Sequence, residues 1–323
     1  MPHVALAATF AESRRILKSA DYVPTAMADR YRAIGERLGE DFSPAIRLLE
    51  LLPVFVSGPR HANTRREMAL RIAAARPHQL HALQQYTHRL PALLAPGQTI
   101  DLLTQFVRPL WQALADAGSG DLHLPASLVS GCTDLFDSRS RLRARLTVNE
   151  ALREFIAADP ASADQRLLIL GQNVLGMRPF IGSLTLSLHA LFSANLGRPL
   201  ARIAYPARFP LSSLPTTDRW RGSQQTDTPA DERETVRCVL HSARLSTAEN
   251  DEAMYGIGEH ACLGRPISND AWTMVTKQLA SLDVTVASST LELPTPLPHD
   301  DDDLLQLSDP FIKPRSLKVR IES

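Results

Sequence analysis

The sequence predicts a mainly α-helical protein with small β-sheets at its periphery. Three observations predict this class: a long apolar run over residues 164–192, amphipathic runs over 40–53 and 59–72, and short alternating segments near both ends. Apolar residues that recur with helical spacing indicate helices, whereas alternation over a few residues indicates strands. A chain of 323 residues is long for one core, but large single domains of this size exist. We therefore expect a single domain over residues 1–323.

Composition and charge narrow the class of protein. Lys plus Arg and Asp plus Glu both number 35, so the formal net charge is zero and favours neither nucleic acid nor an anionic membrane. We find no run of about 18 apolar residues that would span a bilayer, and residues 1–8 lack the basic segment of a signal peptide. The three cysteines are far apart and do not suggest a disulfide framework. We expect a cytoplasmic protein without nucleic-acid or membrane partners.

The N-terminal part predicts a strand followed by helices. Residues 3–8 are expected to form a short strand, and an amphipathic helix follows through residues 12–17. Pro59 suits the first turn of a later helix, because its missing N–H would have no partner there. His61 and Arg65 are four residues apart and therefore share one face of that helix.

Residues 78–150 predict further helices, with breaks at Pro91, Pro96 and residues 118–120. This region carries histidines, but they do not have the spacing of a zinc site. We expect these side chains to face solvent: His78, His81 and His88.

The run over residues 164–192 is apolar nearly all round, as in a helix buried in a large core. Its middle carries Arg178 and Pro179. Proline inside a helix removes a backbone hydrogen bond and costs about 3 kcal/mol, and a buried arginine is costly unless an anion pairs with it. Two such costs on adjacent residues indicate function. In the alternative, Arg178 faces a surface carboxylate and Pro179 merely bends the helix.

Beyond this helix the chain predicts short strands and polar loops. Residues 221–232 indicate an exposed loop, and residues 235–243 alternate towards a strand or a short helix. Two more strands are expected at 283–286 and 290–293. The acidic run at 300–303 indicates a solvated loop tip, with a weak cation site as the alternative.

The most informative segment is residues 255–264, which read YGIGEHACLG. Glycines at this density let the backbone bend tightly and approach a flat ligand. Cys262 precedes an amphipathic run, and at the mouth of a helix the unpaired N–H groups and the dipole favour thiolate over thiol. Thiolate is one of the axial ligands of haem iron. The alternative is a glycine-rich turn with a buried structural cysteine.

This segment resembles the haem-thiolate signature of the cytochrome P450 family, with Tyr255 where phenylalanine is usual. The resemblance implies the P450-type fold, haem b (iron protoporphyrin IX) as cofactor, and the cysteine as metal ligand. It covers nearly the whole chain in order, through a closing strand at residues 314–321, whereas the usual longer N-terminal portion is missing. It therefore implies an abbreviated fold with a trimmed β-rich subdomain. The matching positions are Gly256, Gly258, His260, Cys262 and Gly264.

The resemblance also implies which residues neutralise the haem propionates. His61 and Arg65 stand in a segment similar to the family's Pro-x-His-x-x-x-Arg, and Arg219 resembles an arginine that reaches a propionate from a strand. His260 joins them. By themselves, a histidine and an arginine on one helix would indicate only a solvated face. The family's Glu-x-x-Arg pair is reduced to Arg208, because the glutamate is missing.

In the apolar helix, Gly176, Arg178 and Pro179 take the place of the family's Gly-x-Asp/Glu-Thr proton relay. The Arg-Pro pair resembles the peroxide-using fatty-acid hydroxylases and decarboxylases, whose arginine pairs with the substrate carboxylate. The cysteine loop, by contrast, follows the ordinary bacterial form. The resemblance implies a P450-like monooxygenase or peroxygenase that acts on a small carboxylic acid in specialised metabolism. Its oxidant is peroxide, or oxygen with a ferredoxin-type electron donor, and non-oxidative haem chemistry is a variant.

A second class of function stays open, that of a non-catalytic helper. The chain also resembles the degenerate P450-like partners that activate antibiotic glycosyltransferases. The shortened chain and the missing glutamate favour this hypothesis. The intact motif around Cys262 favours the enzyme, since a helper has no use for a thiolate ligand.

Overall fold

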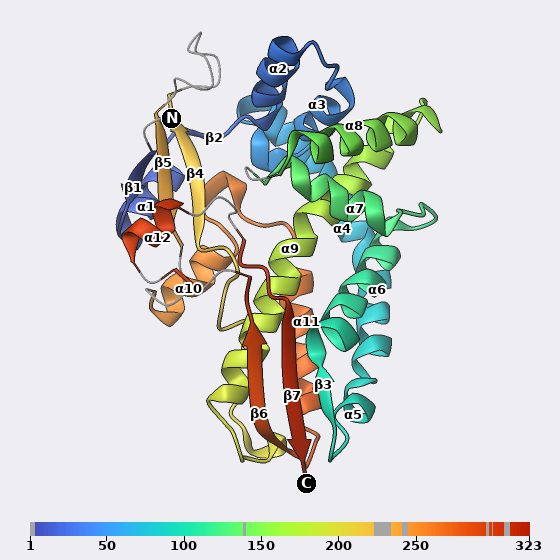
Figure 1. Cartoon of the computed structure of the whole chain (residues 1–323), viewed down its shortest axis with the longest axis vertical. Coiled ribbons are helices and arrows are strands. Elements are labelled where there is room, and N and C mark those ends of the chain that lie inside the picture. The colour runs from blue at the N-terminus through green and yellow to red at the C-terminus, as the bar shows by residue number, and fades with distance from the viewer. Residues whose placement is uncertain are drawn as a thin grey trace.

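In the computed structural model of the chain, helices make up most of the described residues and the strands form two small sheets, which confirms the predicted class (Figure 1). The described residues are 4–137, 140–222, 234–240, 245–294, 297–298, 300–306 and 311–323.

The helices vary from single turns to spans of about 30 residues. In chain order they are α1 (Phe10–Lys18), α2 (Met27–Leu38), α3 (Ser43–Glu50), α4 (Gly58–Thr87), α5 (Leu90–Leu93), α6 (Arg108–Ser119), α7 (Ala126–Cys132), α8 (Leu142–Ala157), α9 (Ala163–Ser193), α10 (Thr247–Met254), α11 (Arg265–Leu279) and α12 (Asp301–Gln306). Shorter helical turns are η1 (Pro53–Phe55), η2 (Leu103–Val107), η3 (Thr133–Leu135), η4 (Leu200–Arg202) and η6 (Gly258–His260).

The two sheets lie in different parts of the molecule (Figure 1). One has the strand order β1-β5-β4-β2, with β1 parallel to β5 and the other pairs antiparallel. The second has the order β3-β7-β6 and is antiparallel. The strands are β1 (Val4–Ala7), β2 (Tyr22–Pro24), β3 (Thr99–Asp101), β4 (Thr216–Arg221), β5 (Thr235–Val239), β6 (Thr285–Glu292) and β7 (Ser316–Glu322).

Helix α9 runs through the middle of the molecule and joins its two largest hydrophobic cores (Figure 1). Leu167 to Val174 pack in one core with α2, α3, α7 and α8, while Phe180 to Phe192 pack in the other with α11 and the β3-β7-β6 sheet. The helix continues through Pro179 without a break. By length and hydropathy α9 could cross a membrane, which our sequence analysis did not expect, but 56% of its most apolar stretch is buried in the protein.

The structure corrects three local predictions. The strands expected at 283–286 and 290–293 are one strand, β6, because β7 pairs along its whole length and a bulge between Val286 and Ser288 absorbs the irregularity. The acidic run at 300–303 is not a loop tip: Asp301–Asp303 form the first turn of α12, where acids favour the helix dipole. Pro91 lies in the first turn of α5 and does not end a helix.

Other local predictions agree with the structure where it describes them. The expected strand at 3–8 and the apolar helix at 164–192 are present as β1 and α9. The segment 235–243 forms the strand β5, while residues 241–243 lie outside the described residues. Most of the expected loop at 221–232 also lies outside them. The histidine side chains expected to face solvent are exposed: His78, His81 and His88.

Candidate functional site

The cysteine loop connects α10 to α11 and requires glycine at two positions. Gly256 and Gly258 have φ angles of +74° and +71°, in the left-handed region that disfavours other residues. A Cβ on Gly256 would also lie 3.2 Å from the carbonyl oxygen of His260. The N–H of Cys262 donates to the carbonyl of Tyr255 at 2.5 Å and closes the loop. The tight bend predicted from the sequence is confirmed.

Two residues separate Cys262 from the start of α11, and the N–H groups of Gly264 and Arg265 donate towards its sulfur. The side chain is accessible, yet protein surrounds it closely enough to remove much of its hydration. This desolvation raises the pKa of the Cys262 thiol above its ordinary value, although the two amides and the charge of Arg65 lower it. The helix mouth alone therefore does not favour thiolate, contrary to our expectation. A bound metal ion would reverse the balance, because a coordinated thiol is deprotonated.

Four predicted propionate ligands converge beside this loop. The rings of His61, from α4, and His260, from η6, lie against each other with centroids 4.3 Å apart and planes tilted by 50°. The pKa of His260 falls to about 3, chiefly through burial and then through the charges of Arg219, His61 and Arg65. Because these charges act on one imidazole, α4, β4 and the cysteine loop bring their basic side chains to a single place.

Two histidine nitrogens of this basic cluster lack a partner within the part of the chain that the structure describes, although buried polar groups usually have one. Among the described residues, His61 Nε2 and His260 Nδ1 are buried without a hydrogen-bond partner. Arg219 is 8% exposed and donates to Thr217 Oγ1 (3.1 Å) and to the carbonyl of Asp218 (2.9 Å), not to a carboxylate. Haem propionates would supply acceptors for such groups and offset the cost of burying the guanidinium. The residues present therefore fit haem.

Burial also lowers the pKa of Arg219 and the pKa of His61. For His61 the charge of Arg65 acts in the same direction, and the carboxylate of Glu259 opposes it. Glu259 Oε2 lies 3.9 Å from His61 Nδ1, but its side chain is 78% exposed. It is therefore a weak partner for the cluster.

Hydrogen bonds that sequence reasoning missed hold the loop in place. Tyr255 is buried, and its hydroxyl donates to Asn269 Oδ1 on α11 at 2.8 Å. The guanidinium of Arg265 lies 5.3 Å from the centre of the same ring. The hydroxyl that distinguishes Tyr255 from the family's phenylalanine thus links the start of the loop to the helix that follows it. Only the unusual tyrosine in the motif could have signalled this contact.

Residues 205–210 precede β4 and are held by neutral hydrogen bonds. Trp272 Nε1 donates to the carbonyl of Pro206 at 2.8 Å, and Asn250 Nδ2 donates to the carbonyl of Pro210 at 2.7 Å. Arg208 itself is exposed. Sequence reasoning missed both Trp272 and Asn250, which have no motif around them.

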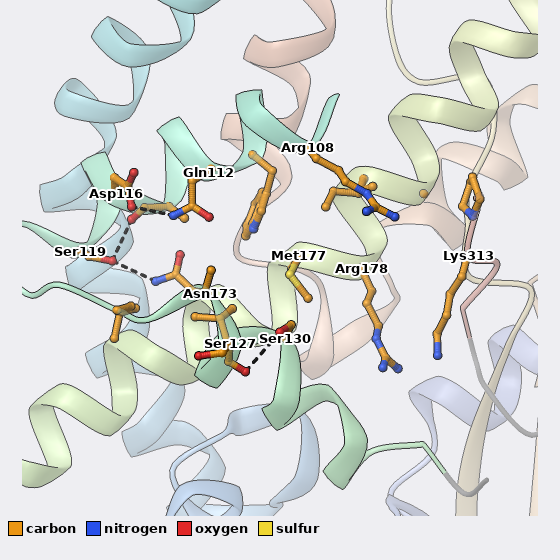
Figure 2. A pocket seen from close by; sticks show the side chains of 18 of the residues that line it. Arg108, Gln112, Asp116, Ser119, Ser127, Ser130, Asn173, Met177, Arg178 and Lys313 are labelled. Carbon is orange, nitrogen blue, oxygen red and sulfur yellow. Dashed lines mark hydrogen bonds between the residues drawn. The ribbon is translucent and has the colours of Figure 1, made fainter. Parts of the chain in front are cut away.

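The other predicted site residues, Gly176, Arg178 and Pro179, lie on α9 by a pocket of about 540 Å³ (Figure 2). The pocket lies between α6, α7, α9 and residues 312–314. Arg178 is half-buried, lines this pocket and donates from Nη2 to Thr133 Oγ1. None of the pocket's lining residues comes from the cysteine loop or the basic cluster. The structure thus brings together the predicted haem ligands and places Arg178 in a pocket of its own.

Gly176 and Pro179 have contacts that explain their positions. A Cβ on Gly176 would lie 2.6 Å from the indole of Trp111, so this glycine lets α6 approach α9 closely. The carbonyl of Pro179 accepts a hydrogen bond from Ser213 Oγ at 3.2 Å. Among the described residues, no three His, Cys, Asp or Glu side chains gather as they would around a metal ion.

Neither a protein-family model nor a curated protein matches this sequence, but many solved cytochrome P450 structures match its fold. P450BioI in complex with an acyl carrier protein ligated to hexadec-9Z-enoic acid is 14% identical, with a TM-score of 0.66 over 98% of this chain and 92% of that chain. A thermophilic cytochrome P450 from Sulfolobus tokodaii is 16% identical, with a TM-score of 0.63 over 97% and 93%. OxyB from teicoplanin biosynthesis, in complex with the X-domain, is 19% identical, with a TM-score of 0.63 over 98% and 92%. The chain therefore has the cytochrome P450 fold, as the cysteine motif predicted.

Proposed function

We propose that the protein is a haem-thiolate oxidoreductase of the P450 type, a single cytoplasmic domain that binds haem b. The observation that carries this proposal is the convergence of the Cys262 loop with four basic side chains: His61, Arg65, Arg219 and His260. These residues come from segments far apart in the chain. A fold that gathers them beside an accessible cysteine is suited to a flat ligand with a metal centre and two carboxylates.

Each part of this site has a role in the proposal. Cys262 binds the iron through its sulfur, and the N–H groups of Gly264 and Arg265 stabilise the negative charge on that atom. The basic cluster orients the haem by its propionates. Gly256 and Gly258 allow the bend that presents the sulfur. When bound, the haem supplies the oxidative chemistry, which a thiolate ligand favours by donating electron density to the iron.

For the substrate we propose a small organic acid of specialised metabolism, anchored by Arg178. A guanidinium binds carboxylates through paired, charge-assisted hydrogen bonds, and Arg178 lines a pocket of suitable size for a small molecule. Because Arg178 and Pro179 replace an acid and a hydroxyl that would relay protons, peroxide is the favoured oxidant. Oxygen with electrons from a ferredoxin-type partner, and non-oxidative haem chemistry, are the variants of this hypothesis.

The alternative function is that of a non-catalytic helper of a biosynthetic enzyme such as a glycosyltransferase. One observation favours it: Arg208 is exposed, whereas the arginine of a Glu-x-x-Arg pair would be buried near the haem-binding loop. The haem site has its ligands nonetheless. We therefore place the enzyme before the helper.

Absorption spectroscopy of the purified protein, first ferric and then reduced under carbon monoxide, tests the proposal. We expect the strongly red-shifted band of a thiolate-bound carbonyl complex, and we expect Cys262→Ser to lose it. Cys132→Ser is the matched control, because Cys132 is buried in a hydrophobic core away from the loop. If no haem band forms even after reconstitution, the enzyme proposal fails and the helper becomes the better account.

A further inference from the structure

The pocket beside Arg178 has two chemically different ends (Figure 2). Figure 2 shows Arg178 and Lys313 reaching towards one end, with Arg108 on the same side. Hydrogen-bonding side chains line the other end and Met177 lies between the two ends, while Trp111 and Ile181 also line the pocket. The residues of the second end are Gln112, Asp116, Ser119 and Asn173.

The first end is suited to an anionic group. Arg178 is half-buried, and Lys313 Nζ pairs with Asp137 Oδ2 at 3.0 Å. The lining residues that the structure describes include three cations on this side, Arg108, Arg178 and Lys313, and one acid, Asp116, at the other end. An anion placed between Arg178 and Lys313 gains hydrogen bonds from charged donors, which are about twice as strong as neutral ones.

The second end presents a hydrogen-bond acceptor on a buried residue. Asn173 is 3% exposed, and its Nδ2 donates to Ser119 Oγ (3.2 Å) and to the carbonyl of Ile169 (2.9 Å). These two bonds use both hydrogens of the amide and fix its orientation. No described residue donates to Asn173 Oδ1, which Figure 2 shows on the side facing Gln112. Asn173 lines the pocket, so its free acceptor favours a ligand that brings a hydrogen-bond donor.

We propose that this pocket binds an organic acid that carries a hydroxyl or amino group at its far end. The acid group is held by Arg178 and Lys313, the apolar body lies against Trp111 and Met177, and the donor bonds to Asn173 Oδ1. The inference rests on the proposed function in taking Arg178 as the substrate anchor, and it names the substrate class.

Helix α9 sets the distance between the acid group and the hydrogen-bond donor of this ligand. Asn173 and Arg178 are five residues apart on α9, which is about 7.5 Å along the helix axis. A short α-hydroxy or α-amino acid has its two groups on adjacent carbons and does not reach both residues. The ligand therefore has several bonds, for example an aromatic ring and a short chain, between its acid and its donor.

Calorimetric titration of the haem-loaded protein with three probes tests this inference. The probes are 4-(4-hydroxyphenyl)butanoate, 4-phenylbutanoate, which lacks the donor, and 4-(4-hydroxyphenyl)butanamide, which lacks the charge. We expect the hydroxy acid to bind most tightly and each of the other two to bind about tenfold more weakly. Because the comparison changes the ligand and not the protein, it does not depend on whether a variant folds.

Protein variants test whether the differences in affinity among the probes arise in this pocket. Lys313→Gln should weaken the two acids about tenfold and leave the amide unchanged, whereas Lys318→Gln, on the exposed side of β7, should change none of them. Asn173→Leu should remove the difference between the hydroxylated and the unsubstituted acid. Equal affinities for the three probes, no binding of any of them, or a Lys313→Gln protein that behaves like Lys318→Gln would overturn the inference.

The two proposals fail in different ways. Loss of the haem band in the absorption spectrum removes the proposed enzyme, while the calorimetric series can still be measured on the purified protein. A normal haem spectrum with no preference among the probes removes the substrate class and leaves the haem-thiolate proposal intact.

Discussion

At the scale of single residues, the cysteine loop combines backbone strain with charge. Gly256 and Gly258 hold positive φ angles so that the chain can turn back towards Cys262. The N–H groups that follow the turn then stabilise negative charge on the sulfur, while the surrounding protein disfavours it. The loop therefore suits the proposed metal-bound thiolate better than a free thiolate, since a metal ion would supply the positive charge that stabilises the desolvated sulfur.

Gly256→Ala should destabilise the protein by more than Gly39→Ala. Both glycines have similar positive φ angles, +74° and +69°, which cost alanine about 1–2 kcal/mol. A Cβ on Gly39 meets nothing within 4 Å, whereas one on Gly256 lies 3.2 Å from the backbone oxygen of His260. The free energy of unfolding in urea measures both losses. Equal losses would show that the close contact adds nothing.

Tyr255→Phe should lower the free energy of unfolding by about 1 kcal/mol, because it removes the hydrogen bond to Asn269 and keeps the ring. Haem binding should persist, since the ring still closes the loop. Tyr86→Phe is the control: the Tyr86 hydroxyl has no hydrogen bond with any described residue, so its removal should cost little. A Tyr255→Phe protein as stable as the control would contradict the role assigned to this hydroxyl.

At the scale of elements, α9 carries three glycines, and a different segment of the chain packs closely against each of them. A Cβ on Gly171 would collide with Leu52, one on Gly176 with Trp111, and one on Gly182 with Ser213. Each contact brings a different part of the chain against the central helix. The glycines therefore explain how a helix with bulky apolar residues almost all round can still be approached so closely.

Gly176→Ala should destabilise the protein by about 1–3 kcal/mol through overpacking against Trp111. The three nearest atoms belong to the far edge of the indole, so Trp111→Phe should relieve most of the clash. A double-mutant cycle from thermal or urea unfolding measures the coupling. Additive effects of the two changes would show that the indole is not what constrains position 176.

Some of these residues and elements could be predicted from the sequence, and others could not. The spacing in residues 255–264 predicted Cys262 as a haem ligand and, through the resemblance, led to His61 and Arg65. Lys313 and Asn173 share no motif, and only tertiary packing places them on one pocket. The single strand β6 escaped prediction for a similar reason, since its pairing with β7, and not its own alternation, keeps the serines extended.

At the scale of the whole molecule, the basic cluster gathers side chains from distant parts of the chain. Arg65 lies on α4, Arg219 on β4 and His260 beside the cysteine, so more than 150 residues separate the first from the second. In the protein without haem, their charges act on one another at close range and lower the pKa of His260. A dianionic ligand that contacts all of them binds the folded chain only, and its binding free energy then adds to the stability of the fold.

Haem should therefore raise the thermal unfolding midpoint of the protein. Iron-free protoporphyrin IX separates the contribution of the propionates from that of the bond between iron and Cys262. The iron-free ring keeps both propionates but cannot bond to Cys262, so we expect it to give a smaller rise than haem. At a ligand concentration of 100 times Kd the stabilisation is about 2.7 kcal/mol, so a weaker ligand gives a smaller shift at the same concentration.

Cys262→Ser should reduce the rise with haem to that with protoporphyrin, whereas Arg219→Gln should reduce both. Equal rises in the wild-type protein would mean that the sulfur does not bind the iron, and no rise with either ring would mean that the basic cluster serves another anion.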